Sequence, residues 1–295
     1  MPKRLLNRSE EKVREQLDAI CSREDVEIES KSRVADVLPI NNSGIDDELF
    51  SYALKAHFDF VVTDTDWLPL FAVEFDSPSH RTPVQRSRDA KKNVLCKRFE
   101  FPLLRINDNY LRPIANRMNL LTWIIESWFY KEAFYEAQLA GNIPPYEPCD
   151  PAMIVHSPGY SDPFPYNLGY DARIRLREFY NAGHCKQPSP AEMAVINSTG
   201  ALRLVSIIFV SETKVIMAKT GMWKQLFSLP ISGVLNDIAT VDLCNHVQEY
   251  LRDGTTNHLY SLNEARKVVQ SCQSHSLAFK GGPESVMETL GMSDN

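Results

Sequence analysis

Three carboxylates lie in or beside two short apolar runs in the first half of the chain. Asp59 lies within the run at 57–63, Glu74 lies within the run at 70–75, and Asp76 follows directly. Carboxylates are disfavoured inside strands unless they face water or bind something. If the two runs pair as a hairpin, Asp59 lies beside Glu74, and strand alternation places Glu74 and Asp76 on one face. Clustered carboxylates repel one another unless a cation lies among them, and hard oxygen ligands suit Mg²⁺ or Mn²⁺.

A basic stretch follows these carboxylates directly. Residues 81–98 contain seven Lys or Arg and one Asp, and residues 84–98 are predicted to form a helix. An acidic cluster followed by basic side chains is what phosphodiester cleavage needs, because a metal ion activates water while cations hold the phosphates. Taken alone, a basic run is more often a solvated helix face. The candidate nucleic-acid-binding residues are Arg86, Arg88, Lys91 and Lys92.

The order of these pieces resembles the PD-(D/E)XK nuclease superfamily, in an uncharacterised branch similar to the very-short-patch repair endonucleases. The branch pattern is an Asp on one strand, Glu-x-Asp-Gly-x-x-His, a helix with Asp-x-x-Lys or Asp-x-x-Arg, and a short strand. A leading helix with Leu-x-x-x-Glu precedes them. The matching positions are Leu6 and Glu10, then Asp59, then Glu74, Asp76 and His80, then Asp89 and Lys92, then Leu104, Arg105 and Ile106.

The resemblance, which covers residues 5–135, implies a metal site. Asp59 and Glu74 would be the main ligands of Mg²⁺ or Mn²⁺. Glu10 on the leading helix would help hold the metal by ordering a metal-bound water.

The same resemblance implies three further catalytic roles. Asp76 occupies the place where the usual superfamily motif has its lysine, and Lys92 on the following helix would replace that lysine. Its ammonium would orient the attacking water or stabilise the transition state. His80 would act as a general base or hold a phosphate. Asp76 itself would be a ligand, a partner of Lys92, or a structural carboxylate of the following turn.

The elements that must position these residues alternate between helices and strands. A hairpin followed by a helix and another strand builds a mixed sheet flanked by helices, which is an α/β, restriction-endonuclease-like fold. The order predicted is a helix at 10–20, a strand at 26–40, a loop at 41–48, strands at 57–63 and 70–75, a helix at 84–98, a strand at 102–106 and a long helix at 114–140.

Composition divides the chain into three parts. Nine of the 18 prolines fall between residues 144 and 190, which indicates an extended segment. We therefore expect a nuclease-like domain at 1–140, a proline-rich linker at 141–185, and a smaller α+β domain at 186–295. The last part is expected to contain strands at 202–210, 214–219 and 223–231 and helices at 237–254 and 261–274.

The global composition restricts partners and compartment. The net charge is −6, so a protein that coats DNA through a basic surplus is excluded, but a local patch is not. Six widely spaced cysteines form neither a disulfide framework nor a zinc pattern. The charged start has no apolar signal segment, and no run is long enough for a membrane span. A cytoplasmic protein without a membrane partner is expected.

The leading hypothesis is a metal-dependent endonuclease acting on DNA, in a defence, mobile-element or repair context. The alternative is a nuclease-fold module that binds nucleic acid or a protein without turnover. In a third interpretation the chain is an interaction protein whose nuclease-like half is a scaffold. The C-terminal domain would choose the substrate or a protein partner, and the sequence does not predict the oligomeric state.

Overall fold

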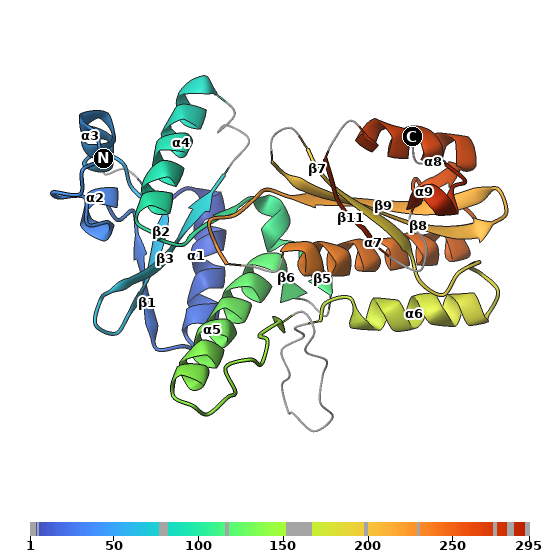
Figure 1. Cartoon of the computed structure of the whole chain (residues 1–295), viewed down its shortest axis with the longest axis horizontal. Coiled ribbons are helices and arrows are strands. Elements are labelled where there is room, and N and C mark those ends of the chain that lie inside the picture. Colours follow the sequence, from blue (N-terminus) through green and yellow to red (C-terminus); the bar gives the residue numbers. More distant parts are fainter. Residues whose placement is uncertain are drawn as a thin grey trace. The chain divides into compact units, whose positions relative to one another are not determined.

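The chain is a mixed α/β protein with several sheets (Figure 1). It divides into two compact units. The first contains Met1–Pro113, Arg117–Glu147 and Gln225–Leu229, and the second contains Ile114–Asn116, Pro148–Lys224 and Pro230–Asn295. The computed structural model describes residues 4, 6–76, 82–115, 118–151, 167–197, 200–228, 231–273, 276–281 and 286–292.

The first unit is built on a four-stranded sheet in the order β1-β2-β3-β4. β1 (Val26–Ser30), β2 (Phe60–Asp64) and β3 (Pro69–Phe75) are antiparallel neighbours, and β4 (Leu103–Ile106) is parallel to β3. The predicted hairpin is therefore confirmed as β2–β3. Its turn places Trp67 at a φ of 63°, which lets the chain reverse over a few residues. The parallel pair requires a crossover between β3 and β4, and the basic helix supplies it.

Helices lie on both faces of this sheet (Figure 1). α2 (Val34–Val37), α3 (Asp47–Ala53) and α4 (Pro83–Arg98) share one apolar cluster with inward residues of β2, β3 and β4. On the other face Phe71 of β3 stacks edge-on against Trp128 of α5 (Leu120–Leu139) at 4.9 Å. Alternation along β3 thus leaves Ala72 and Glu74 on the α4 side.

α1 (Arg8–Cys21) completes this unit and packs against α5, β1 and β3. Between β4 and α5 the chain forms a 3₁₀ turn at Asp108–Leu111 and two short strands, β5 (Pro113–Ala115) and β6 (Met118–Asn119). The long helix expected from residue 114 therefore begins only at Leu120, where the Asn119 side chain accepts a hydrogen bond from the Thr122 N–H.

Two elements predicted in the first half end earlier than expected. The strand expected at 26–40 ends at Ser30, because Lys31 adopts a left-handed φ of 59° that breaks the pairing ladder, and α2 follows. The loop expected at 41–48 ends in the start of α3, whose Asp46 side chain accepts a hydrogen bond from the Leu49 N–H.

The second unit is built on a five-stranded antiparallel sheet in the order β10-β9-β8-β7-β11. The strands are β7 (Ala191–Ile196), β8 (Leu202–Ser211), β9 (Lys214–Met222), β10 (Leu259–Ser261) and β11 (Ser276–Gly281). The sequence predicted β8 and β9 but not β7. The described part of the stretch 223–231 does not form the expected strand: its residues 225–228 belong to the first unit, where Leu226 makes one isolated bridge to Leu103.

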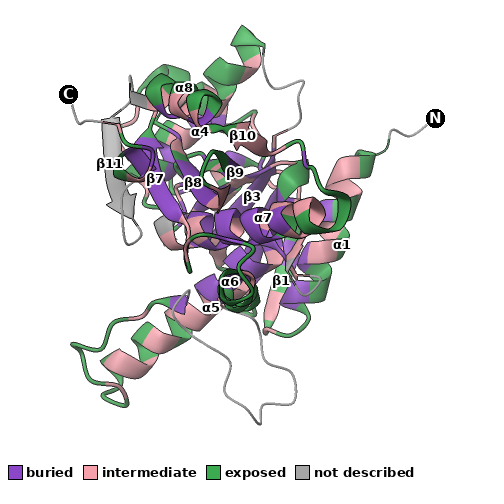
Figure 2. Cartoon of the chain, turned by 90° about the vertical axis from the view of Figure 1, so that its right-hand side faces the viewer, coloured by how far each residue is buried: buried purple, intermediate pink, exposed green. Residues whose placement is uncertain are grey.

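Helices cover both faces of this second sheet, and the ribbons of β7, β8 and α7 are largely coloured as buried (Figure 2). α6 (Tyr170–Asn181) and α7 (Ile231–Asp253) share an apolar cluster with one face, and α8 (Leu262–Gln273) and α9 (Val286–Thr289) share one with the other. α6 lies inside the stretch that was expected to be a linker at 141–185. No helix among the described residues is both long and apolar enough to cross a membrane.

Candidate active site

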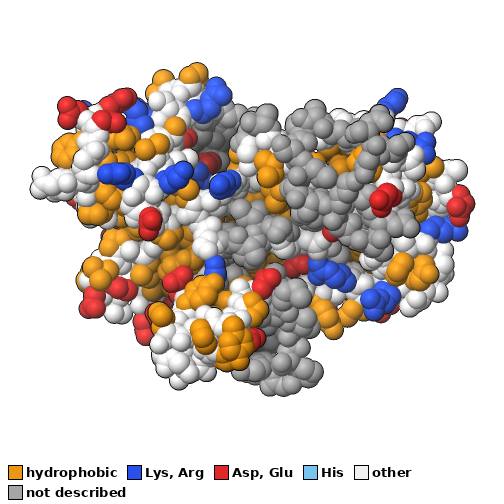
Figure 3. Space-filling view, in the orientation of Figure 1, with side chains coloured by type: hydrophobic (Ala, Val, Ile, Leu, Met, Phe, Trp, Pro, Cys, Tyr) orange, Lys and Arg blue, Asp and Glu red, His pale blue; other side chains and the backbone are white. Residues whose placement is uncertain are grey.

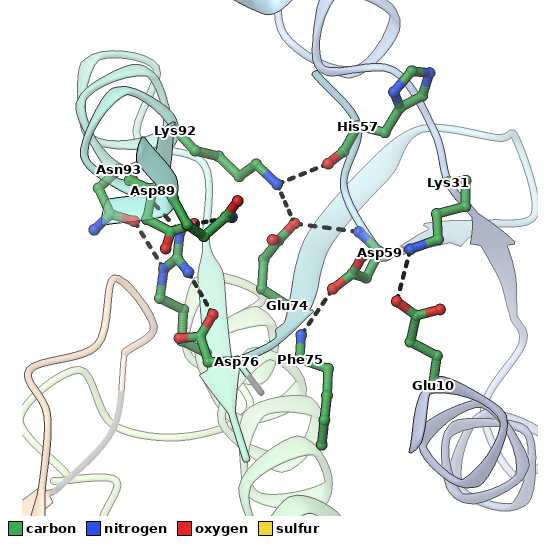
Figure 4. A network of polar contacts seen from close by, with 12 residues as sticks. Glu10, Lys31, His57, Asp59, Glu74, Phe75, Asp76, Asp89, Lys92 and Asn93 are labelled. Carbon is green, nitrogen blue, oxygen red and sulfur yellow. Dashed lines mark hydrogen bonds and ion pairs between the residues drawn. The ribbon is translucent and has the colours of Figure 1, made fainter. Parts of the chain in front are cut away.

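A buried ion pair joins α4 to β3. Lys92 Nζ donates to Glu74 Oε1 at 2.6 Å, and the two residues are only 6% and 3% exposed (Figure 4). Lys92 Nζ also donates to the backbone carbonyl of His57 at 2.7 Å. α4 begins with Pro83 and is capped by the Thr82 side chain, so a rigid helix start positions the lysine. The buried face of α4 therefore contains one charged side chain, Lys92, together with Leu95 and Cys96.

Burial disfavours the charged forms of both side chains of this pair. Desolvation raises the pKa of Glu74 to about 7, the positive charge of Lys92 partly offsets that rise, and the nearby charge of Asp59 adds to it. Lys92 favours the charged form of Glu74, so removing Lys92 leaves a buried carboxyl group without its compensating cation. Phe58 lies under the ammonium, with 5.3 Å between the nitrogen and the ring centre.

Asp59 lies directly before β2 and beside Glu74. Its backbone N–H donates to Glu74 Oε1 at 3.2 Å, and its own Oδ2 accepts from the Phe75 N–H at 2.9 Å (Figure 4). These two bonds fix the Asp59 carboxylate against the end of β3. The hairpin thus brings together the two carboxylates that the sequence singled out as metal ligands.

A second lysine lies between Asp59 and the leading helix. Lys31 Nζ donates to Asp59 Oδ1 at 2.7 Å and to Glu10 Oε1 at 2.9 Å. Burial lowers the pKa of Lys31, but the hydrogen bonds and charges of Asp59 and Glu10 outweigh it and raise the pKa above its usual value. Glu10 Oε2 also accepts from the Asn7 N–H, so this glutamate closes the capping box of α1. No motif in the sequence pointed to Lys31.

Asp76 belongs to a neighbouring network centred on β4. Arg105 Nη1 donates to Asp76 Oδ1 at 2.8 Å, Arg105 Nε donates to Asn93 Oδ1 at 3.0 Å, and Arg105 Nη2 lies 3.5 Å from Asp89 Oδ1. The Gln225 side chain accepts from the Arg105 N–H at 2.9 Å and donates to its carbonyl at 3.1 Å. Asp76 thus faces α4 as Glu74 does. Its cation is Arg105, which was not predicted to be a site residue.

The four basic residues proposed to contact nucleic acid differ in orientation. Arg86 and Arg88 are exposed on α4. Lys91 is half-buried and pairs with Glu48 of α3 at 2.5 Å. Lys92 turns inward to Glu74, so it is placed for chemistry at the site rather than for surface contact.

The carboxylates can be tested for their fit to a metal ion. Among the described residues, no group of three or more His, Cys, Asp or Glu side chains could hold a metal ion as it stands. Glu10 and Asp59 nevertheless already share one cation, the Lys31 ammonium, and Glu74 lies next to Asp59. Carboxylate oxygens are the donors that Mg²⁺ or Mn²⁺ prefers, but here Lys31 holds Glu10 and Asp59, and Lys92 holds Glu74. His80, which was predicted to act as a general base or to hold a phosphate, lies outside the described residues.

Comparison with known proteins finds one family match over part of the chain and no activity. Residues 2–117 match a family described as a protein of unknown function (DUF2726), which covers the site and the whole first sheet. Neither the curated proteins nor the solved structures contain a match to the chain.

Proposed function

We propose that the first unit is a metal-dependent endonuclease of the PD-(D/E)XK superfamily that hydrolyses phosphodiester bonds in DNA with Mg²⁺ or Mn²⁺. The observation that carries this proposal is the buried Lys92–Glu74 pair directly beside Asp59. Burying a lysine with a carboxylate, beside a second carboxylate whose side chain is 15% exposed, is costly, and such arrangements cluster at functional sites. The mixed sheet, with its hairpin, crossover helix and parallel fourth strand, supports a restriction-endonuclease-like core.

The residues of this site would have different roles. Asp59 and Glu74, with Glu10, would hold the divalent cation, which supplies an activated water and neutralises charge on the phosphate. Lys92 uses two of its three N–H groups on Glu74 and on the His57 carbonyl, and the third has no acceptor among the described residues. That N–H is available to orient water or a phosphoryl oxygen, where charge develops in the transition state.

The test is cleavage of DNA in the presence of Mg²⁺ or Mn²⁺. We expect Asp59→Asn, Glu74→Gln and Lys92→Met each to lower the rate on the order of a hundredfold or more. Asp66→Asn is the matched control, because this carboxylate is exposed in the β2–β3 turn. Thermal unfolding of each variant separates lost chemistry from lost folding. Equal rates of cleavage by the wild type and by the Asp59 and Glu74 variants would refute the proposal.

A second function is favoured by one specific observation. Lys31 already supplies the positive charge between Glu10 and Asp59. These two carboxylates are thus neutralised without a metal ion, as expected of a nuclease-fold module that binds nucleic acid without turnover. This alternative predicts no cleavage with any divalent metal, but salt-sensitive DNA binding that is weakened by charge reversal at Arg86, Arg88 and Lys91. Metal-dependent cleavage that disappears in Asp59→Asn would rule it out.

A further inference from the structure

A cavity of about 590 Å³ opens between α3 and α4 in the first unit. This volume lies in the range that proteins use for small organic ligands, and it accommodates a single nucleotide. Its walls carry two flat rings and four cations. They are Tyr52, Lys55, His57, Arg88, Lys91 and Lys92.

The charges of this cavity are not balanced from within. Two carboxylates, Glu48 and Asp89, also line it, and Glu48 pairs with Lys91. Lys55 and Arg88 are exposed and have neither an ion-pair nor a hydrogen-bond partner among the described residues. Figure 3 shows Lys and Arg side chains gathered over the part of this unit that contains α4, with Asp and Glu at the α3 edge. Two unpaired cations at one cavity favour an anionic ligand.

The cavity shares a wall with the candidate active site. Lys92 lines the cavity and at the same time donates to Glu74 and to the His57 carbonyl. Figure 4 shows the His57 imidazole pointing away from Glu74, while its carbonyl oxygen points to Lys92. A ligand in the cavity therefore lies next to the buried ion pair.

We propose that this cavity binds one unstacked nucleotide of the strand being cleaved, with Lys55 and Arg88 at its phosphate and the Tyr52 ring against its base. The inference rests on the proposed nuclease function and specifies its substrate as single-stranded or locally unpaired DNA. In duplex DNA the bases are stacked inside the double helix. A nucleotide therefore enters the pocket between α3 and α4 only after it leaves the base stack. Cations along the backbone and one aromatic face per base are the usual recognition of single strands.

The test is binding of the full chain to a short fluorescent single-stranded oligonucleotide and to its blunt duplex, with EDTA present so that nothing is cleaved. Wild type is expected to bind the single strand more tightly than the duplex. Lys55→Glu and Arg88→Glu should each weaken single-strand binding about tenfold, and the double variant more than either alone. Lys97→Glu is the matched control, because it reverses a charge on α4 outside the cavity.

Tyr52→Leu separates base stacking from charge and should weaken single-strand binding about tenfold without changing its salt dependence. Competition with a free deoxynucleoside monophosphate distinguishes a strand from a free nucleotide. The inference is overturned if the double charge variant binds like the wild type, if duplex binds as tightly as single strand, or if the monophosphate competes as strongly as the oligonucleotide.

A cleavage arm keeps the two proposals apart. If the wild type cleaves DNA with Mn²⁺ and the cavity variants bind normally, the cavity assignment fails and the nuclease stands. If the wild type binds single strands through the cavity but cleaves nothing with any metal, the nuclease assignment fails and the binding site stands.

Discussion

Replacement of Lys31 tests whether its ammonium occupies the position of a metal ion. In the folded protein this side chain bridges Glu10 and Asp59, and a divalent cation that uses both carboxylates has to displace it. Lys31→Met removes the charge but keeps a side chain of similar length. Methionine is preferable to glycine, because position 31 has a φ of 59° and glycine would also relieve backbone strain there.

The size of the effect follows from the burial of the three side chains. Lys31 is 31% exposed, Glu10 12% and Asp59 15%, so each ion pair is only partly screened by water. Pairs of this kind contribute about 0.5–1 kcal/mol each, or about 1–2 kcal/mol for the two together. Without metal, Lys31→Met should lower the free energy of unfolding by that amount. With metal, the affinity should rise about 5- to 30-fold, because the competing cation is gone.

The assay is titration calorimetry with Mn²⁺, supported by thermal unfolding at several Mn²⁺ concentrations. A ligand at a hundredfold excess over its Kd stabilises a protein by about 2.7 kcal/mol, so tighter binding appears as a larger rise in Tm. Lys12→Met is the control, since this lysine is exposed on α1 and has no partner among the described residues. An unchanged Mn²⁺ affinity in Lys31→Met would refute the displacement argument.

Two further predictions concern buried charge. Lys92→Met leaves Glu74 buried without its cation and should cost about 3–5 kcal/mol in urea unfolding, whereas the double variant with Glu74→Gln should recover much of that loss; a double variant no more stable than Lys92→Met would contradict the reasoning. In the second unit, burial and then the charge of His258 lower the pKa of His246 from 6.5 to about 4, and the two rings stack at 3.5 Å. Between these pH values the unfolded chain binds the proton and the folded chain does not, so stability is full above about pH 6.5 and is lost as the pH falls toward 4. The loss should be about 1–2 kcal/mol, since the half-exposed ring is screened, and His246→Gln should flatten the pH dependence of Tm. A wild-type and variant pair with the same pH dependence would show that the stacked ring is not its source.

Local sequence patterns were sufficient to predict the helix and strands around the site. Two short apolar runs joined by a turn predicted the β2–β3 hairpin, the basic stretch predicted α4, and residues 102–106 predicted β4. These signals are strong because side-chain period and turn chemistry act over a few residues. The strand expected at 223–231 was wrong for a complementary reason: residues 225–229 belong to the first unit, where Leu226 bridges Leu103, and they do not join the second sheet.

The sequence by itself determined which carboxylates share a hairpin. Asp59 directly precedes β2, beside Glu74 of β3, and Asp76 follows β3 on the same face as Glu74, because an extended chain alternates its side chains with a period of two. Only the tertiary structure decided which cation each carboxylate takes: Lys92 for Glu74, Lys31 for Asp59, and an arginine for Asp76.

The physical reason is that ion pairing depends on burial and on segments far apart in the chain. Lys92 and Lys31 are both lysines in polar stretches, yet one is nearly inaccessible to water and the other remains about a third exposed. Desolvation and geometry select among several possible partners only once the helices have packed on the sheet. The cavity between α3 and α4 likewise exists only after residues 48–57 and 85–92 meet, so no pattern within either segment could have indicated it.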